Sequence, residues 1–262
     1  MKFGLLGAGA MGGAILNGAL KSGVVVAENV WVYDPLAKNR DRFAALGCHI
    51  APDAEALGNT VDLLLIAVTP QVSKTALAGL KSSMDGKVVF SIMAGVTSHR
   101  IREMIEGTVR VLRIMPNVCA RVNYGVYALC SENDLNEDER SFAQRFFTSI
   151  GVVEWMREDL IDSAAAVSGS GPAFIAMFAE AMADGGVMEG LPRDQAYRLT
   201  MHTLIGTAKM MLETDMHPGA LKDQVSSPGG STIVGVNALE SHGFRGAVLD
   251  AIHTASRKNR EF

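Results

Sequence analysis

The chain has 262 residues, of which 48% are hydrophobic and 20% are charged, and its formal net charge is −4 at pH 7. This length is sufficient for one large domain or two modest ones, each with a buried core. A net negative chain offers no positive field that would recruit nucleic acid or an anionic membrane, so we expect neither as a partner.

The cysteines and the apolar runs also limit the class of protein. The chain has three cysteines, Cys48, Cys119 and Cys130, and their odd number and wide spacing argue against a secreted disulfide framework. The histidines, cysteines and carboxylates show no metal-ligand spacing, so we expect no metal site. The apolar run from Leu63 to Val68 is too short to span a bilayer. We therefore expect a cytoplasmic protein.

Short apolar runs alternate with segments of helical periodicity over the first part of the chain. The predicted strands are Lys2–Leu6, Val30–Tyr33, Val61–Val68, Lys87–Ile92 and Val109–Ile114. The predicted helices between them are Ala10–Lys21, Leu36–Leu46, Gln71–Leu80 and Ser98–Ile105. Because parallel strands need crossover connections, these βα units predict an α/β fold with a doubly wound parallel, Rossmann-like sheet. Two later strands, Tyr124–Cys130 and Val152–Trp155, flank a helix near Asn136–Ser149.

The pattern changes near Asp159, where Ala, Met and Leu at helical spacing replace the β-branched runs. Pro172 and Pro192 suit helix starts, and Gly190 and Gly243 suit helix ends. The predicted helices are Ala173–Val187, Arg193–Glu213, Gly219–Val225, Ser231–Glu240 and Phe244–Lys258. We therefore predict a sheet domain over residues 1–158 and an all-helical domain over residues 159–262.

A glycine-rich turn connects the first predicted strand to the first predicted helix. Its residues are Gly7, Ala8, Gly9, Ala10, Met11 and Gly12. The first glycine permits a tight turn, the second lets a pyrophosphate approach the backbone, and the third lets helix and strand pack closely. The motif alone is weak evidence, but its position between strand and helix is that of a dinucleotide site. The sequence therefore predicts that this turn binds NAD or NADP.

Asp34 follows the second predicted strand, 22 residues after Gly12. An acidic residue at this place binds the ribose hydroxyls of NAD. The nearby Lys38, Arg40 and Arg42 are instead suited to neutralise the 2′-phosphate of NADP, and Asp34-Pro35 is also typical of a simple turn. The choice between NAD and NADP stays open at this point.

Three further turns follow predicted strands, and ligands of doubly wound sheets bind at the carboxyl ends of the strands. Small residues and prolines in these turns permit close approach to the ribose and the nicotinamide. We expect the cofactor to contact residues of these turns: Ala67, Val68, Thr69, Pro70, Ala94, Gly95 and Asn117.

The loop Ser226–Thr232 runs into the predicted helix that begins at Ser231. A helix N-terminus presents free backbone N–H groups that attract anions, and Ser227, Ser231 and Thr232 add hydroxyl donors. A serine or threonine that only caps the helix is the alternative interpretation. Beside a dinucleotide turn, an anion site favours an enzyme with a carboxylate substrate.

The chain resembles the pyrroline-5-carboxylate reductases from end to end. The residues that carry the resemblance are Gly7–Gly12, Ala67–Gln71, Ser91–Val96, Arg113–Asn117, Asp162, Ser168–Ala173, Gly190–Pro192 and Val225–Ile233. The last segment, with its Ser-Pro-Gly-Gly, is highly specific to that family. The resemblance implies hydride transfer from NADH or NADPH to 1-pyrroline-5-carboxylate, which gives L-proline in the last step of proline biosynthesis.

The resemblance also assigns the substrate residues. Ser227, Gly230, Ser231 and Thr232 are expected to bind the carboxylate of the cyclic imino acid. Thr232 is expected to act as the catalytic residue, with its hydroxyl near the ring nitrogen. Whether Thr232 donates a proton or only orients the ring is left open.

Two departures from the family pattern bear on the cofactor. Thr69 stands where the family commonly has a lysine, and Asp34 stands where NADPH-using members often have a neutral or basic residue. Both differences remove positive charge from the region that would hold NADP. They favour NADH, or the use of both cofactors.

The helical half is rich in methionine, and such a stripe is typical of a core or a subunit interface. Its members are Met177, Met182, Met188, Met201, Met210 and Met211. The resemblance implies an intertwined homodimer, assembled in some members into a larger ring of dimers, with the substrate loop close to a partner's cofactor. The stretch Ser168–Pro172 either lines the active site or joins the two domains, and we favour the joint.

Two other functions compete with this interpretation. A related reductase acting on a β-hydroxyacid or another imine usually has a catalytic lysine in its helical domain, where only Lys209 and Lys222 are central and neither lies in a recognisable motif. A catalytically silent dinucleotide-binding oligomer that senses redox state needs no anion site, so the Ser227–Thr232 loop argues against it.

Overall fold

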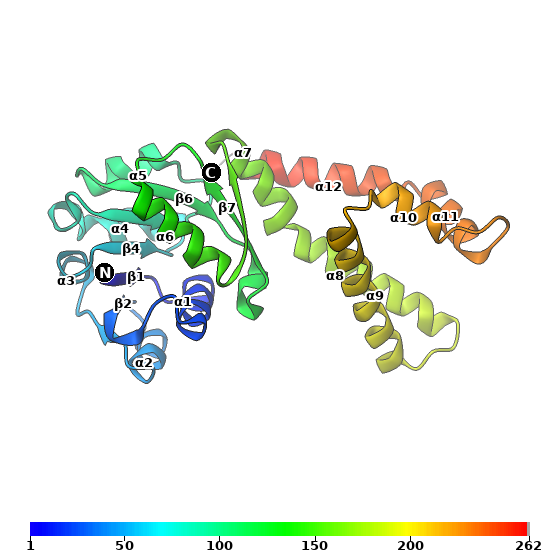
Figure 1. Cartoon of the computed structure of the whole chain (residues 1–262), viewed down its shortest axis with the longest axis horizontal. Coiled ribbons are helices and arrows are strands. Elements are labelled where there is room, and N and C mark those ends of the chain that lie inside the picture. The colour runs from blue at the N-terminus through cyan, green and yellow to red at the C-terminus, as the bar shows by residue number, and fades with distance from the viewer. Residues whose placement is uncertain (261–262) are drawn as a thin grey trace. The chain divides into compact units, whose positions relative to one another are not determined.

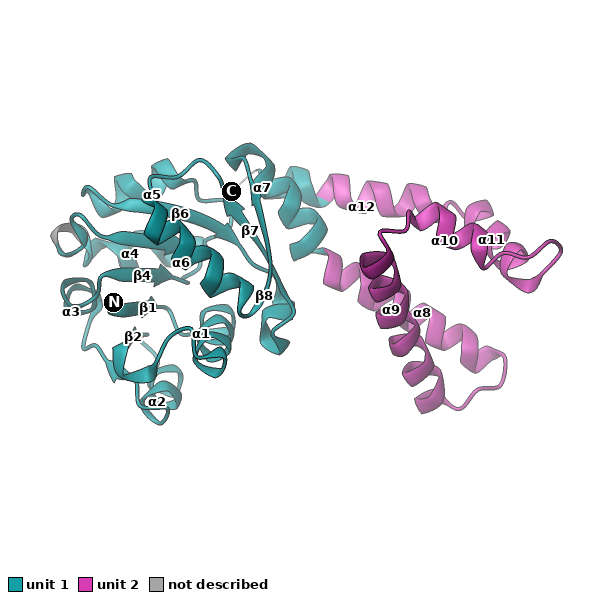
Figure 2. Cartoon of the chain, viewed as in Figure 1, with its two compact units in different colours: residues 1–170, 255–262 teal, residues 171–254 magenta. Residues whose placement is uncertain are grey.

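The computed structural model describes residues 1–260, with only the backbone described at residues 81 and 82 (Figure 1). The chain divides into two compact units, which are coloured separately in Figure 2. The first comprises residues 1–170 and the C-terminal residues from Ala255, and the second comprises residues 171–254. The boundary predicted at 158–159 is defined by sequence pattern rather than by contacts, and it stays a prediction.

The first unit is built on an eight-stranded sheet in the order β3-β2-β1-β4-β5-β6-β7-β8. The strands β1 to β6 are mutually parallel, β7 is antiparallel to β6, and β8 is parallel to β7. The strands are β1 (Phe3–Leu6), β2 (Val30–Tyr33), β3 (His49–Ile50), β4 (Leu63–Ile66), β5 (Val88–Ser91), β6 (Arg110–Met115), β7 (Gly125–Cys130) and β8 (Gly151–Met156). The predicted doubly wound α/β fold is confirmed, and the strand order reverses beside β1, between β2 and β4.

Helices cover both faces of this sheet. They are α1 (Ala10–Ser22), α2 (Ala37–Ala44), α3 (Ala54–Thr60), α4 (Pro70–Ala78), α5 (Ser98–Ile105), α6 (Glu137–Thr148) and α7 (Glu158–Ala164). Short 3-10 turns are η1 (Ala27–Asn29), η2 (Lys81–Met84) and η3 (Val118–Val122). Alternate residues of the central strands belong to separate cores, as for Leu5 and Leu6 of β1. One core includes Phe146 of α6, and the other includes Leu77 of α4 and Ile101 of α5.

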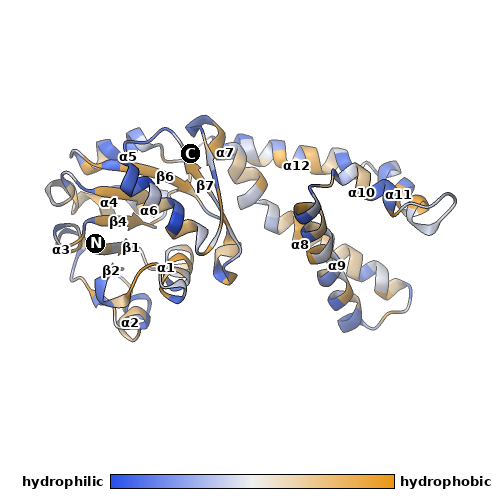
Figure 3. Cartoon of the chain, in the orientation of Figure 1, coloured by the Kyte–Doolittle hydropathy of each residue, from blue (hydrophilic) through white to orange (hydrophobic). Residues whose placement is uncertain are grey.

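The second unit is helical, and its predicted helices are confirmed to within a few residues. They are α8 (Gly171–Met188), α9 (Arg193–Thr214), α10 (Pro218–Gln224), α11 (Ser231–Ser241) and most of α12 (Phe244–Asn259). The rings of Phe178 and Phe244 lie 5.8 Å apart and connect α8 to α12. Figure 3 shows hydrophobic residues along these helices. Many of the large ones are exposed in the single chain; Leu199, for example, is 58% exposed.

The helix α7 continues into α8 through a π-helical turn, η4 (Ala165–Gly169). The combined run Glu158–Met188 is long and apolar enough to cross a membrane, judged by length and composition within the described part of the chain. Only 17% of its most apolar stretch is buried. The run also carries Glu180 and Asp184, and Asp184 forms an ion pair with Arg193 of α9.

Candidate cofactor and substrate sites

The glycine turn has the backbone geometry that its sequence predicts. Gly7 has a φ of +94°, and a Cβ there would lie 2.8 Å from the carbonyl oxygen of Ala67. A Cβ on Gly12 would overlap the Cβ of Ala67 at 2.6 Å, so α1 packs closely on the end of β4 only because residue 12 is glycine. Nothing lies within 4 Å of the Cβ position of Gly9, which is the N-cap of α1 and carries no capping side chain. The first turn of α1 therefore presents N–H groups to an open face suited to a pyrophosphate.

Asp34 lies behind this turn and is only 5% exposed. Its Oδ2 accepts a hydrogen bond of 2.8 Å from the Ala8 N–H, and its Oδ1 accepts one of 2.9 Å from the Leu36 N–H. The carboxylate therefore connects the glycine turn to the end of β2. Sequence reasoning missed this role, and the contact of Asp34 with a ribose stays a prediction.

The three cations that follow Asp34 have different environments. The guanidinium of Arg42 donates to the carbonyl oxygens of Ala8 and Gly9, and lies 4.8 Å from the ring centroid of Phe43. Arg40 donates to the backbone oxygen of Asp34 at 3.1 Å, whereas Lys38 is exposed and has no side-chain partner among the described residues. Of these cations, Arg42 is the one that contacts the glycine turn itself.

The other predicted cofactor residues lie at the same edge of the sheet, where β4 and β5 end. Ala67 donates its N–H to the carbonyl oxygen of Leu6 at 2.8 Å, so the ends of β1 and β4 are directly adjacent. Thr69 is the N-cap of α4 and Pro70 its first residue. After β5 the chain turns at Gly95, which has a φ of +70°. Ala67, Val68, Thr69, Pro70, Ala94 and Gly95 are partly or fully exposed, as a ligand contact requires.

Asn117, at the turn after β6, is 5% exposed and engaged at both ends of its amide. Its Nδ2 donates to the carbonyl oxygen of Ser168 at 3.1 Å, and its Oδ1 accepts from the Val126 N–H at 3.1 Å. Ser168 belongs to the π-turn between α7 and α8, a feature often found at functional sites. Asn117 therefore fixes this turn beside the strand ends, and its contact with a cofactor stays a prediction.

A buried ion-pair cluster explains another motif of the sequence. Arg113 of β6 is 3% exposed, and its Nη2 lies 2.6 Å from Asp162 Oδ1. Its Nη1 lies 3.7 Å from Glu158 Oε1, which also accepts hydrogen bonds from the N–H and hydroxyl of Ser98. These contacts hold α7 against β6 and the start of α5. Arg113 and Asp162 are therefore structural partners. Because they lie far apart in the sequence, the sequence alone does not predict this ion pair.

The predicted substrate loop lies in the second unit. Gly230 is the N-cap of α11, and no side chain caps this helix. Gly229 has a φ of +69°, and Gly230 donates its N–H to the carbonyl oxygen of Ser227 at 3.0 Å, so the loop is a tight turn. Ser227, Ser231 and Thr232 are exposed, and their hydroxyls have no partner among the described residues. The capping interpretation is therefore wrong, and these hydroxyls are available to a ligand.

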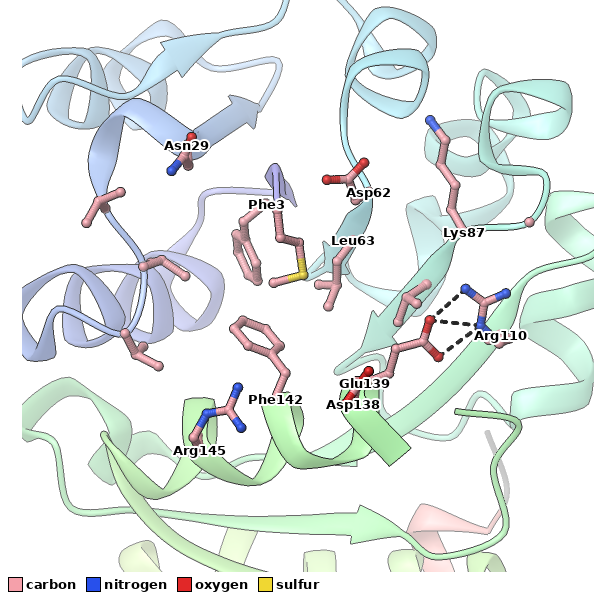
Figure 4. A pocket seen from close by; sticks show the side chains of 16 residues that line it. Phe3, Asn29, Asp62, Leu63, Lys87, Arg110, Asp138, Glu139, Phe142 and Arg145 are labelled. Carbon is pink, nitrogen blue, oxygen red and sulfur yellow. Dashed lines mark hydrogen bonds and ion pairs between the residues drawn. The ribbon is translucent and has the colours of Figure 1, made fainter. Parts of the chain in front are cut away.

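A large cavity lies elsewhere, at the edge where the strands begin (Figure 4). It has a volume of about 610 Å³ and is lined by Phe3, Leu63 and Arg110 near the starts of β1, β4 and β6. Figure 4 shows Arg110 paired with Glu139 of α6 at one side. Because cofactors of doubly wound sheets bind at the carboxyl ends of the strands, this cavity is not the cofactor site. None of the predicted site residues lines it.

The described residues offer no group of three or more His, Cys, Asp or Glu side chains that could hold a metal ion. All three cysteines are free. Burial, together with the charge of Glu28, raises the pKa of the Cys48 thiol to about 11. This thiol is therefore protonated at neutral pH and unsuited to nucleophilic catalysis.

Two family models match this chain, one in each half. Residues 158–262 match the family model described as pyrroline-5-carboxylate reductase dimerisation. Residues 2–95 match the model described as NADP oxidoreductase, coenzyme F420-dependent. The chain thus combines a dinucleotide-dependent oxidoreductase module with a dimerisation module.

Relatives match over nearly the whole chain. A pyrroline-5-carboxylate reductase of Methanosarcina acetivorans is 40% identical, over 99% of this chain and 97% of its own length. The enzyme of Escherichia coli K12 is 38% identical over the same shares. The crystal structure of Plasmodium falciparum pyrroline carboxylate reductase with NADP bound has a TM-score of 0.91 at 30% identity, covering 100% of this chain and 97% of that one. The chain belongs to the pyrroline-5-carboxylate reductase family.

Proposed function

We propose that the glycine turn of the first unit holds NAD(P)H and that the Ser227–Thr232 loop of the second unit holds the substrate carboxylate. The chain is an NAD(P)-dependent oxidoreductase that reduces 1-pyrroline-5-carboxylate to L-proline, the last step of proline biosynthesis. When bound, the reduced nicotinamide supplies the hydride. The hydride adds to the carbon of the C=N bond, and the ring nitrogen carries a proton in the product. The protein binds and orients the two reactants.

The observation that carries this proposal is the unoccupied hydrogen-bonding capacity at the start of α11. Gly230 leaves the helix without a side-chain cap, while Ser227, Ser231 and Thr232 keep their hydroxyls free. Backbone N–H groups at a helix N-terminus favour negative charge, and the hydroxyls add donors of adjustable direction. Together they suit the carboxylate of a cyclic imino acid.

Thr232 has a second proposed role, at the ring nitrogen. An iminium accepts hydride better than a neutral imine, so a hydrogen-bonding group at the nitrogen favours the reaction. The Thr232 hydroxyl lies in the first turn of α11, beside the carboxylate donors. We assign it the hydrogen bond to the ring nitrogen, which fixes the ring with its C=N carbon toward the nicotinamide.

The cofactor contacts follow from the shared edge of the sheet. The turn Gly7–Gly12 binds the pyrophosphate through its backbone. The turns at Ala67–Pro70 and Ala94–Gly95 line the nicotinamide half, and Asn117 lies at the next strand end. These assignments rest on the open face at Gly9 and on the exposure of the β4 and β5 turns.

The assembly is a homo-oligomer, because the second unit is a dimerisation domain of this family. We propose an intertwined homodimer, assembled into a larger ring of dimers, with the substrate loop of one subunit near the cofactor of another. The run Glu158–Met188 would bury its apolar side chains between subunits rather than in a membrane. Its Asp184–Arg193 ion pair supports this, since charged groups are costly within a bilayer. No nucleic acid partner is proposed, and the enzyme is placed in the cytoplasm.

The substrate role of Thr232 is tested by the Thr232→Val variant, which removes the hydroxyl at nearly constant volume. Losing a hydrogen bond to a charged group costs about 1.5–3 kcal/mol, so we expect kcat with 1-pyrroline-5-carboxylate to fall about 10- to 100-fold. Thr207→Val, an exposed threonine of α9 with no side-chain partner among the described residues, is the matched control. Unchanged kcat in the Thr232 variant would remove its role, and no turnover by the parent chain would favour the silent redox sensor.

The cofactor preference forms a separate proposal. We propose that NADH is used at least as well as NADPH, because the buried Asp34 carboxylate adds negative charge where a 2′-phosphate would lie and Thr69 supplies no cation. We expect the ratio of kcat/KM for NADH to that for NADPH to be at least one, and to fall severalfold in Asp34→Asn. Steady-state kinetics with both cofactors measure this ratio. A strong NADPH preference in the parent chain would contradict the proposal.

A further inference from the structure

Another cavity lies alongside α1 and shares only Ala10 with the turns assigned above. It has a volume of about 310 Å³, and its floor follows one stripe of the helix. The lining residues are Ala10, Ala14, Asn17, Gly18 and Lys21 of α1, Arg42 of α2, Arg121 of η3 and the adjoining Asn123. At 1.5 Å per residue, the stripe extends about 16 Å along α1. The cavity is therefore long enough for a small ligand and begins next to the glycine turn.

The charge of this cavity is of one sign. Lys21, Arg42 and Arg121 line it, and no carboxylate does, although the whole chain has a net charge of −4. Lys21 and Arg121 have no ion pair or side-chain hydrogen bond among the described residues. Like charges around one cavity repel each other, and a bound anion relieves that repulsion. The cavity thus has the electrostatics of an unfilled anion site.

Neutral donors and small side chains complete the cavity. Asn17 and Asn123 add side-chain amides, and Ala10 and Ala14 leave the floor open. A Cβ on Gly18 would lie 2.7 Å from the Asn123 Oδ1, so glycine at this position lets the Asn123 side chain lie directly on α1. Two amides between three cations suit a compact oxyanion with several acceptor oxygens.

Arg42 connects this cavity to the cofactor turn. The same guanidinium that lines the cavity donates to the carbonyl oxygens of Ala8 and Gly9. An anion that neutralises Arg42 weakens the positive potential at the turn where the cofactor pyrophosphate binds. Occupation of the cavity is therefore expected to weaken dinucleotide binding.

We propose that this cavity binds a phosphate group, held by Lys21, Arg42 and Arg121, and that free phosphate bound there raises the KM for the dinucleotide. The binding site is independent of the function proposed above, whereas its effect on KM rests on the glycine turn as the cofactor site. The phosphate has two possible sources, free phosphate and the 2′-phosphate of NADPH, and kinetics distinguish them.

The binding test uses inorganic phosphate and the full chain without cofactor, by isothermal titration at constant ionic strength. We expect saturable binding of one phosphate per chain, weakened at least tenfold in the double variant Lys21→Gln, Arg121→Gln. Arg145→Gln of α6, an exposed arginine without a partner among the described residues and outside this cavity, removes one charge and should leave binding unchanged. Absence of saturable binding, or equal binding by the double variant, would overturn the proposal.

The kinetic test identifies the source of the phosphate. If the ligand is free phosphate, adding inorganic phosphate raises the KM for both NADH and NADPH in the parent chain. It does not raise either KM in the double variant. If the ligand is instead the 2′-phosphate of NADPH, the double substitution raises the KM for NADPH and leaves the KM for NADH unchanged. In the parent chain, inorganic phosphate then competes with NADPH and not with NADH. If neither KM responds to phosphate or to the double substitution, the effect on the cofactor is refuted. Because titration needs no turnover, an enzyme inactive on the imino acid would refute the proposed reaction and leave the binding result intact.

Discussion

At the scale of single residues, Asn117 shows how one buried amide joins parts of the chain distant in sequence. It donates to Ser168, 51 residues later, and accepts from the Val126 N–H. Asn117→Asp keeps the acceptor, removes the donor and places a carboxylate against the Ser168 carbonyl. We expect the free energy of unfolding to fall by about 1–3 kcal/mol, measured by urea denaturation. The control is Asn39→Asp, with no side-chain partner among the described residues; equal stability of both variants would show that the bridge contributes nothing.

The same residue shows the limit of sequence reasoning about the site. The glycine turn is predictable because the tight turn needs glycine at Gly7 and the close packing of α1 on β4 needs glycine at Gly12. Both positions can be recognised from their spacing in the sequence. The hydrogen-bond partners of Asn117 and Asp34 cannot be predicted from the sequence. Ser168 comes near Asn117, and Ala8 comes near Asp34, only when the strands align in the fold. A buried polar side chain must find a partner, but the sequence does not say which one.

At the scale of secondary-structure elements, the start of α6 combines a helix cap with a tertiary ion pair. Asn136 caps the helix by accepting the Glu139 N–H, and Glu139 accepts the Asn136 N–H in return. Glu139 also receives three hydrogen bonds from Arg110 of β6, at 2.6 to 3.1 Å. Burial raises the pKa of the Glu139 carboxyl, but the hydrogen bonds from Arg110 and Asn136 outweigh burial and leave its pKa below the ordinary value.

This lowered pKa gives the stability of α6 a defined pH dependence. A carboxyl whose folded pKa lies below its unfolded value of about 4.3 stabilises the fold above that pH and loses the effect as pH falls through the folded pKa. We expect Glu139→Gln to cost about 1–3 kcal/mol at pH 7 and progressively less below pH ~4. Urea unfolding of variant and parent at each pH gives the difference. Glu137→Gln, exposed in the same helical turn, is the control; a cost independent of pH would exclude the charge as its cause.

The elements that the sequence did not predict have identifiable physical reasons. The strand β3 has two exposed residues, His49 and Ile50, and exists through its pairing with β2 rather than through an apolar pattern. The helix α3 has seven residues, too few for a clear period, and depends on the Asp53 side chain that accepts the Ala56 N–H. The helix α7 runs into α8 through a π-turn, which interrupts the 3.6-residue period.

At the scale of the whole molecule, the two units differ in how much core each encloses. The first unit has two cores on opposite sides of its sheet, whereas the second leaves large side chains uncovered, such as Ile205 at 63% and Leu212 at 84% exposure. Burial of apolar area is the main stabilising term of folding, and the second unit gains little of it alone. Its stability therefore depends on a second copy of the chain, in agreement with its dimerisation family.

This dependence predicts that assembly, stability and activity are lost together. Because the dimer is stabilised by mass action, each tenfold dilution costs about 1.4 kcal/mol of assembly free energy, and Tm should fall with it. Ile205→Glu places a charge on the uncovered α9 surface, so we expect its mass by light scattering to fall to the 27.9 kDa of one chain, with loss of turnover. The control is Leu46→Glu, because Leu46 is 52% exposed and lies in the first unit; it should change neither the mass nor the turnover. A parent chain that is monomeric and active, with a Tm independent of concentration, would contradict an interface built from these helices.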